Sequence, residues 1–229
     1  MFKTDKLYLK KNWDIPIEYH PTNTKRMIIC IPGADGSVRG YKNKYLNLGN
    51  YIQEKNIASF VRVPNDRPQE FIDSAEHFIQ YCLDHSEEIC GEKVCPEIWL
   101  MGFSAGGASI LLTAWEYPWV TKILAINPFL GNDIFRELET YLPLYMGKVF
   151  VVIGEDDKIC DPNFTKKYIE DNAIKKKEPQ IHILPNCDHQ LKGETNSKIL
   201  SQLPEYYFLD KYKSEPFPDG NKGINLLDS

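Results

Sequence analysis

The chain has 229 residues, a formal net charge of −5 and 42% hydrophobic residues. This length fits one domain with a full hydrophobic core, and the composition is that of an ordinary globular protein. An acidic balance without a basic stripe argues against a protein that binds nucleic acid. We expect no signal peptide and no membrane span, because no stretch approaches the roughly 18 apolar residues that cross a bilayer. The expected location is the cytoplasm.

Cysteine usage agrees with a reducing compartment. The six cysteines include no C-x-x-C pair, and Cys30 and Cys82 lie in apolar segments as small core residues. Cys90 and Cys95 flank a charged loop and would pair only in an oxidising compartment. The sequence alone leaves that pairing open.

Apolar periodicity predicts strands that alternate with helices along the chain. Two short strands around residues 11–12 form an antiparallel hairpin, and buried strands follow. The predicted strands are Lys6–Lys10, Ile15–Tyr19, Met27–Ile31, Ala58–Val63, Ile98–Met101, Lys122–Ile126, Val149–Ile153 and Gln180–Leu184. The predicted helices are Gln69–Leu83, Ala105–Trp115, Asn163–Ala173 and Asn196–Leu203. This alternation predicts an α/β fold with a mostly parallel sheet of about eight strands and helices on both faces.

The domain organisation follows from the same pattern. Residues 1–209 form a single predicted domain, and residues 210–229 form a polar tail rich in proline and glycine. We expect this tail to be extended or disordered, and a role in binding a partner stays open. About twenty residues separate the strands that end near Ile126 and begin near Lys148, which leaves room for a small cap or none.

A nucleophile motif follows one of the central strands. Gly102-Phe103-Ser104-Ala105-Gly106 lies between the strand Ile98–Met101 and a helix, which is the setting that Gly-x-Ser-x-Gly requires. Small residues around Ser104 prevent collisions in a strained turn that lifts the hydroxyl above the sheet. The first backbone N–H groups of the helix then point to the same place and suit a developing oxyanion.

Two further strands end in residues that suit a serine nucleophile. The strand Val149–Ile153 leads into an acidic loop with Asp156, Asp157 and Asp161, where a carboxylate can orient an imidazole. Asp161 also precedes a helix and is typical of a helix cap. His189 follows the last strand, in a loop where a general base must lie. His182 lies inside that strand and is interpreted as structural. A metal site at Cys187, Asp188 and His189 is disfavoured because no second ligand cluster completes it.

These three motifs, in this order, resemble the α/β-hydrolase family, from the first hairpin to about Leu209. The motifs are GFSAG, GEDDKICDP and CDH. In that family the acid stands three residues after the glycine that ends the strand, so the resemblance selects Asp157 and implies the triad Ser104, Asp157 and His189. It also implies an oxyanion hole from the backbone N–H groups of Ala34 and Ala105. Pro32 replaces the histidine that commonly precedes the glycine of this loop.

The implied function is a serine hydrolase that cleaves an ester or thioester of a small-molecule acyl substrate through an acyl-enzyme, without metal or cofactor. A small serine peptidase is the alternative within the class. A non-catalytic protein of the same fold that binds a ligand or partner is the alternative outside it. Aromatic and apolar side chains between residues 127 and 147 are candidates for an acyl pocket, although helix packing explains most of them equally well. These are Phe129, Leu130, Phe135, Tyr141, Leu144 and Tyr145. The oligomeric state stays open.

Overall fold

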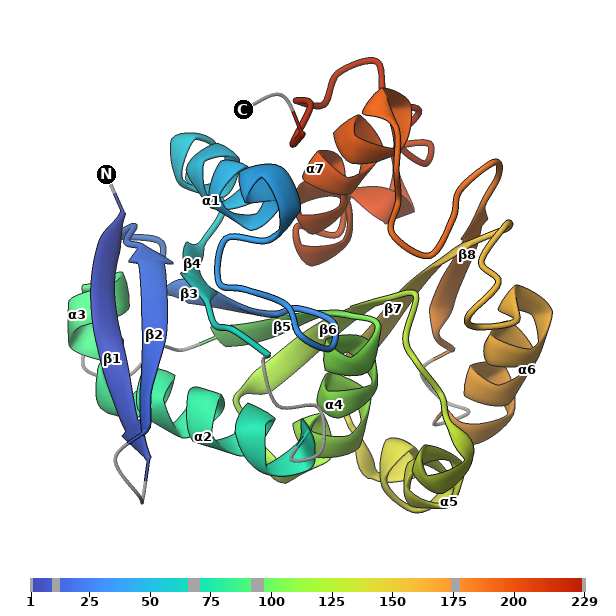
Figure 1. Ribbon diagram of the computed structural model, residues 1–229, viewed down its shortest axis with the longest axis horizontal. Coiled ribbons are helices and arrows are strands. Elements are labelled where there is room, and N and C mark those ends of the chain that lie inside the picture. The colour runs from blue at the N-terminus through green and yellow to red at the C-terminus, as the bar shows by residue number, and fades with distance from the viewer. Residues whose placement is uncertain (1, 10–12, 66–70, 92–96, 174–177, 228–229) are drawn as a thin grey trace.

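The computed structural model describes residues 2–9, 13–65, 71–91, 97–173 and 178–227. One eight-stranded sheet crosses the molecule in the order β1-β2-β4-β3-β5-β6-β7-β8 (Figure 1). Strands β1 and β2 are antiparallel to their neighbours, and the other six run parallel. The strands are β1 Lys3–Leu9, β2 Trp13–His20, β3 Arg26–Ile31, β4 Ser59–Arg62, β5 Glu97–Phe103, β6 Val120–Ile126, β7 Lys148–Gly154 and β8 Gln180–Leu184. The predicted fold class is confirmed.

Alternate side chains of the central strands enter two separate cores. On β5, Ile98 and Leu100 pack on one face of the sheet, while Trp99, Met101 and Phe103 pack on the other. All five are at most 5% exposed, so the strand is buried on both sides. This explains why the sequence shows continuous apolar runs rather than alternation.

Helices cover both faces (Figure 1). Helices α2, α3, α4, α5 and α6 contribute to one core, and α1 and α7 contribute to the other. The helices are α1 Lys44–Glu54, α2 Phe71–Asp84, α3 Ser86–Cys90, α4 Ala105–Thr113, α5 Asn132–Tyr141, α6 Pro162–Asn172 and α7 Glu194–Phe208. Short 3-10 turns lie at Tyr41–Asn43, Ala114–Glu116, Leu142–Leu144 and Lys211–Lys213.

Helix α1 is absent from the sequence-based prediction. Its sequence contains Asn47, Gly49 and Asn50, which are poor helix formers. Packing explains the glycine, because a Cβ at Gly49 would overlap the imidazole of His20. Tertiary contact with the sheet therefore overrides weak helix propensity. Helix α7 also runs beyond its predicted end at Leu203, with Pro204 inside it.

The segment between β6 and β7 contains α5 and one 3-10 turn. Phe135 of α5 packs against the rings of Phe164 and Tyr168, which belong to α6. Tyr141 stacks on Trp115. This segment therefore packs against neighbouring helices, in agreement with the predicted small or absent cap.

The C-terminal segment lies along α7. Its residues 216–227 form no helix or strand, but Leu226 is only 1% exposed. The backbone N–H of Leu226 donates to Ser197 Oγ at 2.6 Å, and its carbonyl accepts from Asn47 Nδ2 at 2.9 Å. Residues 210–227 are thus an irregular segment held between α7 and α1. Cys95 and the predicted hairpin turn at 11–12 lie outside the described residues.

Among the described residues, no helix combines the length and hydrophobicity that a membrane crossing needs.

Candidate active site

Ser104 lies in a strained turn between β5 and α4. Its backbone has φ 49° and ψ −116°, a conformation that a residue with a side chain rarely adopts. The Ser104 N–H donates to the carbonyl of Ile126 at 2.9 Å, and its carbonyl accepts from the N–H groups of Ala108 and Phe129, both at 3.0 Å. Bonds from the end of β6, from the loop after it and from α4 therefore hold the strained backbone of Ser104 in place.

Two glycines permit this turn. A Cβ at Gly102 would overlap the backbone of Gly106, and a Cβ at Gly106 would overlap the carbonyls of Ile31 and Pro32. The glycines of the motif therefore allow close approach of backbone segments, as the sequence predicts. The close approach at Gly106 also packs the start of α4 against the loop after β3.

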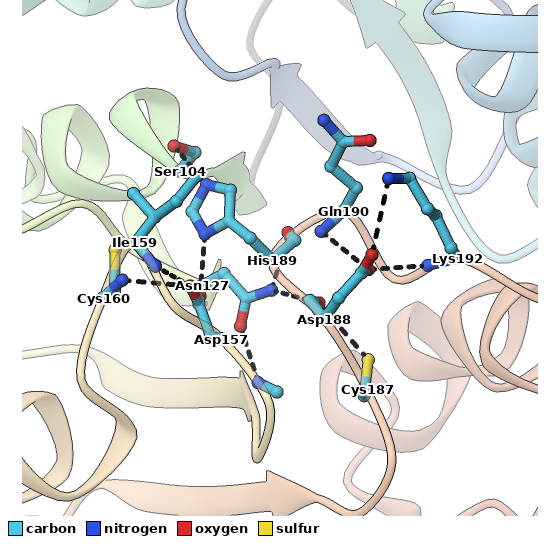
Figure 2. A network of polar contacts seen from close by, with 11 residues as sticks. Ser104, Asn127, Asp157, Ile159, Cys160, Cys187, Asp188, His189, Gln190 and Lys192 are labelled. Atoms are coloured by element: carbon cyan, nitrogen blue, oxygen red, sulfur yellow. Dashed lines mark hydrogen bonds and ion pairs between the residues drawn. The ribbon is translucent and has the colours of Figure 1, made fainter.

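Ser104, His189 and Asp157 form a continuous chain of hydrogen-bonding contacts (Figure 2). Ser104 Oγ lies 2.9 Å from His189 Nε2, and His189 Nδ1 lies 2.7 Å from Asp157 Oδ2. The other oxygen, Oδ1, accepts from the N–H groups of Ile159 at 2.8 Å and Cys160 at 2.9 Å. The Asp157 side chain is fully buried, so its carboxylate is fixed in position.

Asp156 and Asp161, the two other acids of the loop after β7, have different surroundings. Asp161 Oδ1 accepts from the backbone N–H of Phe164 at 2.7 Å, so Asp161 caps α6. The predicted capping role is confirmed. Asp156 is exposed, and the structure gives it no contact with His189. Of the three acids, only Asp157 contacts the imidazole.

Asn127 anchors the histidine loop, and sequence reasoning missed it. This residue directly follows β6, has φ 44° and is 1% exposed. Its Nδ2 donates to the carbonyls of His189 at 2.8 Å and Asp188 at 3.3 Å, and its Oδ1 accepts from the N–H of Gly154 at 2.7 Å. One amide therefore joins the ends of β6 and β7 to the loop after β8 (Figure 2). An asparagine directly after a buried strand was the available signal.

Asp188 closes the loop on its other side. Its Oδ1 accepts from the backbone N–H groups of Gln190 at 3.1 Å and Lys192 at 3.0 Å. Its Oδ2 lies 3.6 Å from Lys192 Nζ (Figure 2). Local turn bonds and Asn127 together fix the backbone that carries His189.

The loop after β3 lies beside Ser104. A Cβ at Gly33 would stand 3.1 Å from Ser104 Cβ, so the backbone there passes very close to the serine. Ala34 follows Gly33 and lines the same cavity as Ser104, and Ala105 is the first residue of α4. Both predicted oxyanion residues thus lie on the segments that flank Ser104.

A cavity of about 500 Å³ opens at Ser104 and His189. Its wall consists of the β3–α1 loop, the start of α1, the loop after β8 and Leu227 of the C-terminal segment. None of the six residues predicted as acyl-pocket candidates between 127 and 147 lines it. The cause is packing: that segment turns toward α4 and α6, and its aromatic rings fill contacts between helices.

One group of potential metal ligands overlaps the triad. Ligand atoms of Asp157, Cys160 and His189 lie within 4.8 Å of one another. Both oxygens of Asp157 already accept hydrogen bonds, however, and both ring nitrogens of His189 are engaged with Asp157 and Ser104. The ligand atoms of Asp157 and His189 are thus already used in the contact chain with Ser104.

No protein-family model and no curated protein sequence matches the chain. Solved structures do resemble it. Est1E from Butyrivibrio proteoclasticus superposes with a TM-score of 0.71 at 12% identity, covering 92% of this chain and 99% of that one. An esterase domain from a Rhodothermus marinus protein gives 0.67 at 13% identity, covering 89% and 95%. Mouse alpha/beta hydrolase domain-containing protein 10 gives 0.64 at 15% identity, covering 92% and 99%. The strand order, the elbow at Ser104 and these likenesses together show that the chain has the α/β-hydrolase fold.

Proposed function

We propose that the protein is a serine hydrolase that cleaves an ester or thioester through an acyl-enzyme intermediate. The observation that carries this proposal is the contact chain from Ser104 Oγ through His189 to the buried carboxylate of Asp157, at 2.9 and 2.7 Å. These distances are within the range for proton transfer between a nucleophile, its base and an orienting acid. The hydrolases and esterases of the same fold support the reaction class.

The first half of the reaction forms the acyl-enzyme. His189 accepts the proton of Ser104 as Oγ attacks the acyl carbonyl, and Asp157 stabilises the imidazolium through Nδ1–H. The two backbone N–H groups that donate to Asp157 Oδ1 keep its other oxygen on His189. His189 then gives its proton to the leaving alcohol or thiol. Water repeats the cycle on the acyl-enzyme and releases the acid.

The developing oxyanion needs donors near Ser104. In the proposed mechanism the N–H groups of Ala34 and Ala105 supply them, each contributing about 3 kcal/mol of transition-state stabilisation. Support comes from the close packing of the Gly33 backbone on Ser104 and from the position of Ala105 at the start of α4.

The shape of the site favours small acyl substrates. The cavity is open and about 500 Å³ in volume, and the segment between β6 and β7 does not cover it. This volume lies within the ordinary range for small-molecule sites. It favours an ester or thioester over a folded protein or a long peptide, and a small peptidase remains the alternative that the substrate panel must test.

The test is a substrate panel with a nucleophile variant. Purified protein is assayed with para-nitrophenyl esters of increasing chain length, with acyl thioesters and with peptide para-nitroanilides. We expect turnover of short acyl esters or thioesters, and a loss of at least about 10⁴-fold in Ser104→Ala. The exposed Ser214→Ala variant serves as the matched control, and thermal unfolding verifies that both variants fold. Equal turnover by Ser104→Ala would refute the proposal, and cleavage of peptides alone would favour the peptidase.

A further inference from the structure

The cavity beside Ser104 carries a cation that the proposed mechanism does not use. Lys44, the first residue of α1, lines this cavity together with Ser104 and His189. Its Nζ lies 5.2 Å from the ring centroid of Phe103, the residue directly before the nucleophile, and 5.0 Å from that of Tyr45. The ammonium therefore lies over two aromatic rings at the wall of the proposed active site.

Lys44 has no anionic partner in contact. Within the part of the chain that the structure describes, its ammonium makes no hydrogen bond and no ion pair. The side chain is half-buried, and burial lowers its pKa from the ordinary value of 10.5. The attractions of Cys30 and Asp188 oppose that shift but are smaller. Burying an ammonium without a carboxylate costs free energy, which a negatively charged ligand would recover.

The other charges at the cavity wall are differently placed. Lys192 is exposed, and its Nζ lies 3.6 Å from Asp188 Oδ2, so its charge is already compensated. Asp35 is an exposed carboxylate on the β3–α1 loop. Among the described cavity-lining residues, Lys44 is thus the cation that no protein carboxylate contacts. A single ammonium of this kind matches a monoanion, and hence a carboxylate rather than a phosphate dianion.

We propose that Lys44 is a specificity-determining residue that binds a carboxylate of the substrate, so that the natural substrate is an ester or thioester carrying a carboxylate near its acyl carbonyl. This inference rests on the proposed function, because it concerns the same cavity. A charge-assisted hydrogen bond from Lys44 then holds the substrate while the rings of Phe103 and Tyr45 hold the ammonium. Such a bond in a partly desolvated site supplies selectivity between charged and neutral substrates.

The experiment compares matched esters on matched variants. Para-nitrophenyl hydrogen glutarate carries a carboxylate where para-nitrophenyl pentanoate carries a methyl group, so their kcat/KM ratio measures the preference for charge on the acyl side. Meta-carboxyphenyl and meta-carbamoylphenyl butanoate measure the preference for charge on the alcohol side. The variants are Lys44→Met, Lys44→Arg and Lys55→Met, the last being a lysine at the other end of α1.

In one of the two pairs, we expect the native protein to prefer the charged ester by about tenfold or more, the range of a single charge-assisted hydrogen bond. Lys44→Met should abolish that preference, Lys44→Arg should restore most of it, and Lys55→Met should retain it. High salt should weaken it. Each preference is a ratio within one variant, so a general loss of active protein does not imitate the result. Equal preferences in native protein and Lys44→Met would overturn the proposal.

A binding measurement separates this proposal from the proposed function. Each of the two charged esters, the glutarate monoester and meta-carboxyphenyl butanoate, is titrated by calorimetry into Ser104→Ala and into Ser104→Ala/Lys44→Met, neither of which needs to turn it over. About tenfold weaker binding in the double variant supports the role of Lys44 even if no ester is hydrolysed. Equal binding of both esters by the two variants overturns it even if the native protein is an active esterase.

Discussion

The triad and the outer wall of the cavity are built in different ways. Each residue of the proposed triad follows a strand of the parallel sheet. Ser104 and His189 are held by bonds from Ile126 and Asn127 at the end of β6, and Asp157 is held by N–H groups of its own loop. The wall opposite combines the β3–α1 loop and the adjoining start of α1 with Leu227 of the C-terminal segment, which is distant in sequence. The sheet therefore positions the chemistry, while packing between α1 and α7 shapes the space for substrate.

The largest expected effect distinguishes the roles of Asp157 and Asp161, two acids in the loop after β7. Asp157→Asn should lower kcat/KM by about 10⁴-fold, because an amide at this position favours the wrong tautomer of His189. The matched control is Asp161→Asn, which alters the cap of α6 and leaves the contacts of His189 in place. Steady-state kinetics on a common ester measures both. A larger loss in Asp161→Asn than in Asp157→Asn would show that the acid is misassigned.

The next effect concerns the outer wall. Leu226→Ala should lower the free energy of unfolding by about 3 kcal/mol, because it leaves a cavity between α1 and α7. Denaturant unfolding measures this change. Ile224→Ala, at a position that is 38% exposed, is the control and should cost less. Equal values for the two variants would mean that the C-terminal segment is not part of the core in solution.

The third effect concerns Asn127, which holds the loop that carries His189. Asn127→Gly retains the left-handed backbone but removes three hydrogen bonds that hold the ends of β6 and β7 and the histidine loop. We expect kcat/KM to fall by about tenfold to a hundredfold, with a smaller change in KM than in kcat. Native-like kcat together with reduced stability would restrict Asn127 to a structural role.

A smaller effect tests the contact between α1 and the sheet. Burial, with the charge of Arg62 adding to it, lowers the pKa of His20 from 6.5 to about 3. The unfolded chain therefore binds a proton near pH 6.5 that the folded chain refuses until about pH 3. Stability should fall as the pH drops through this window, by at most about 1.4 kcal/mol per pH unit from this residue.

Unfolding curves between pH 7 and pH 4 measure that slope. His20→Gln should flatten it, since glutamine does not titrate, while His77→Gln on the exposed side of α2 should leave it as in the native protein. An unchanged slope in His20→Gln would mean that His20 is accessible to protons in the folded state.

Strong local signals made the sheet and the grouping of the three residues of the proposed triad predictable. Buried parallel strands appear as apolar runs, and the strand ends carry Ser104, Asp157 and His189, which the structure brings together. Helix α1 gave no such signal, because Gly49 is present for its contact with His20 rather than for helix propensity. Lys44 and Leu227 reach the cavity only through tertiary packing, which no periodicity of a single sequence reports.

The most direct test of the account is covalent labelling of the nucleophile. Native protein is incubated with a fluorophosphonate, and peptide mass spectrometry locates the adduct, with Ser104→Ala and Asp157→Asn as comparisons. The account predicts an adduct on Ser104, much slower labelling in Asp157→Asn and none at this position in Ser104→Ala. A folded native protein that remains unlabelled, or one labelled at another serine, would contradict the assignment of Ser104 as an activated nucleophile.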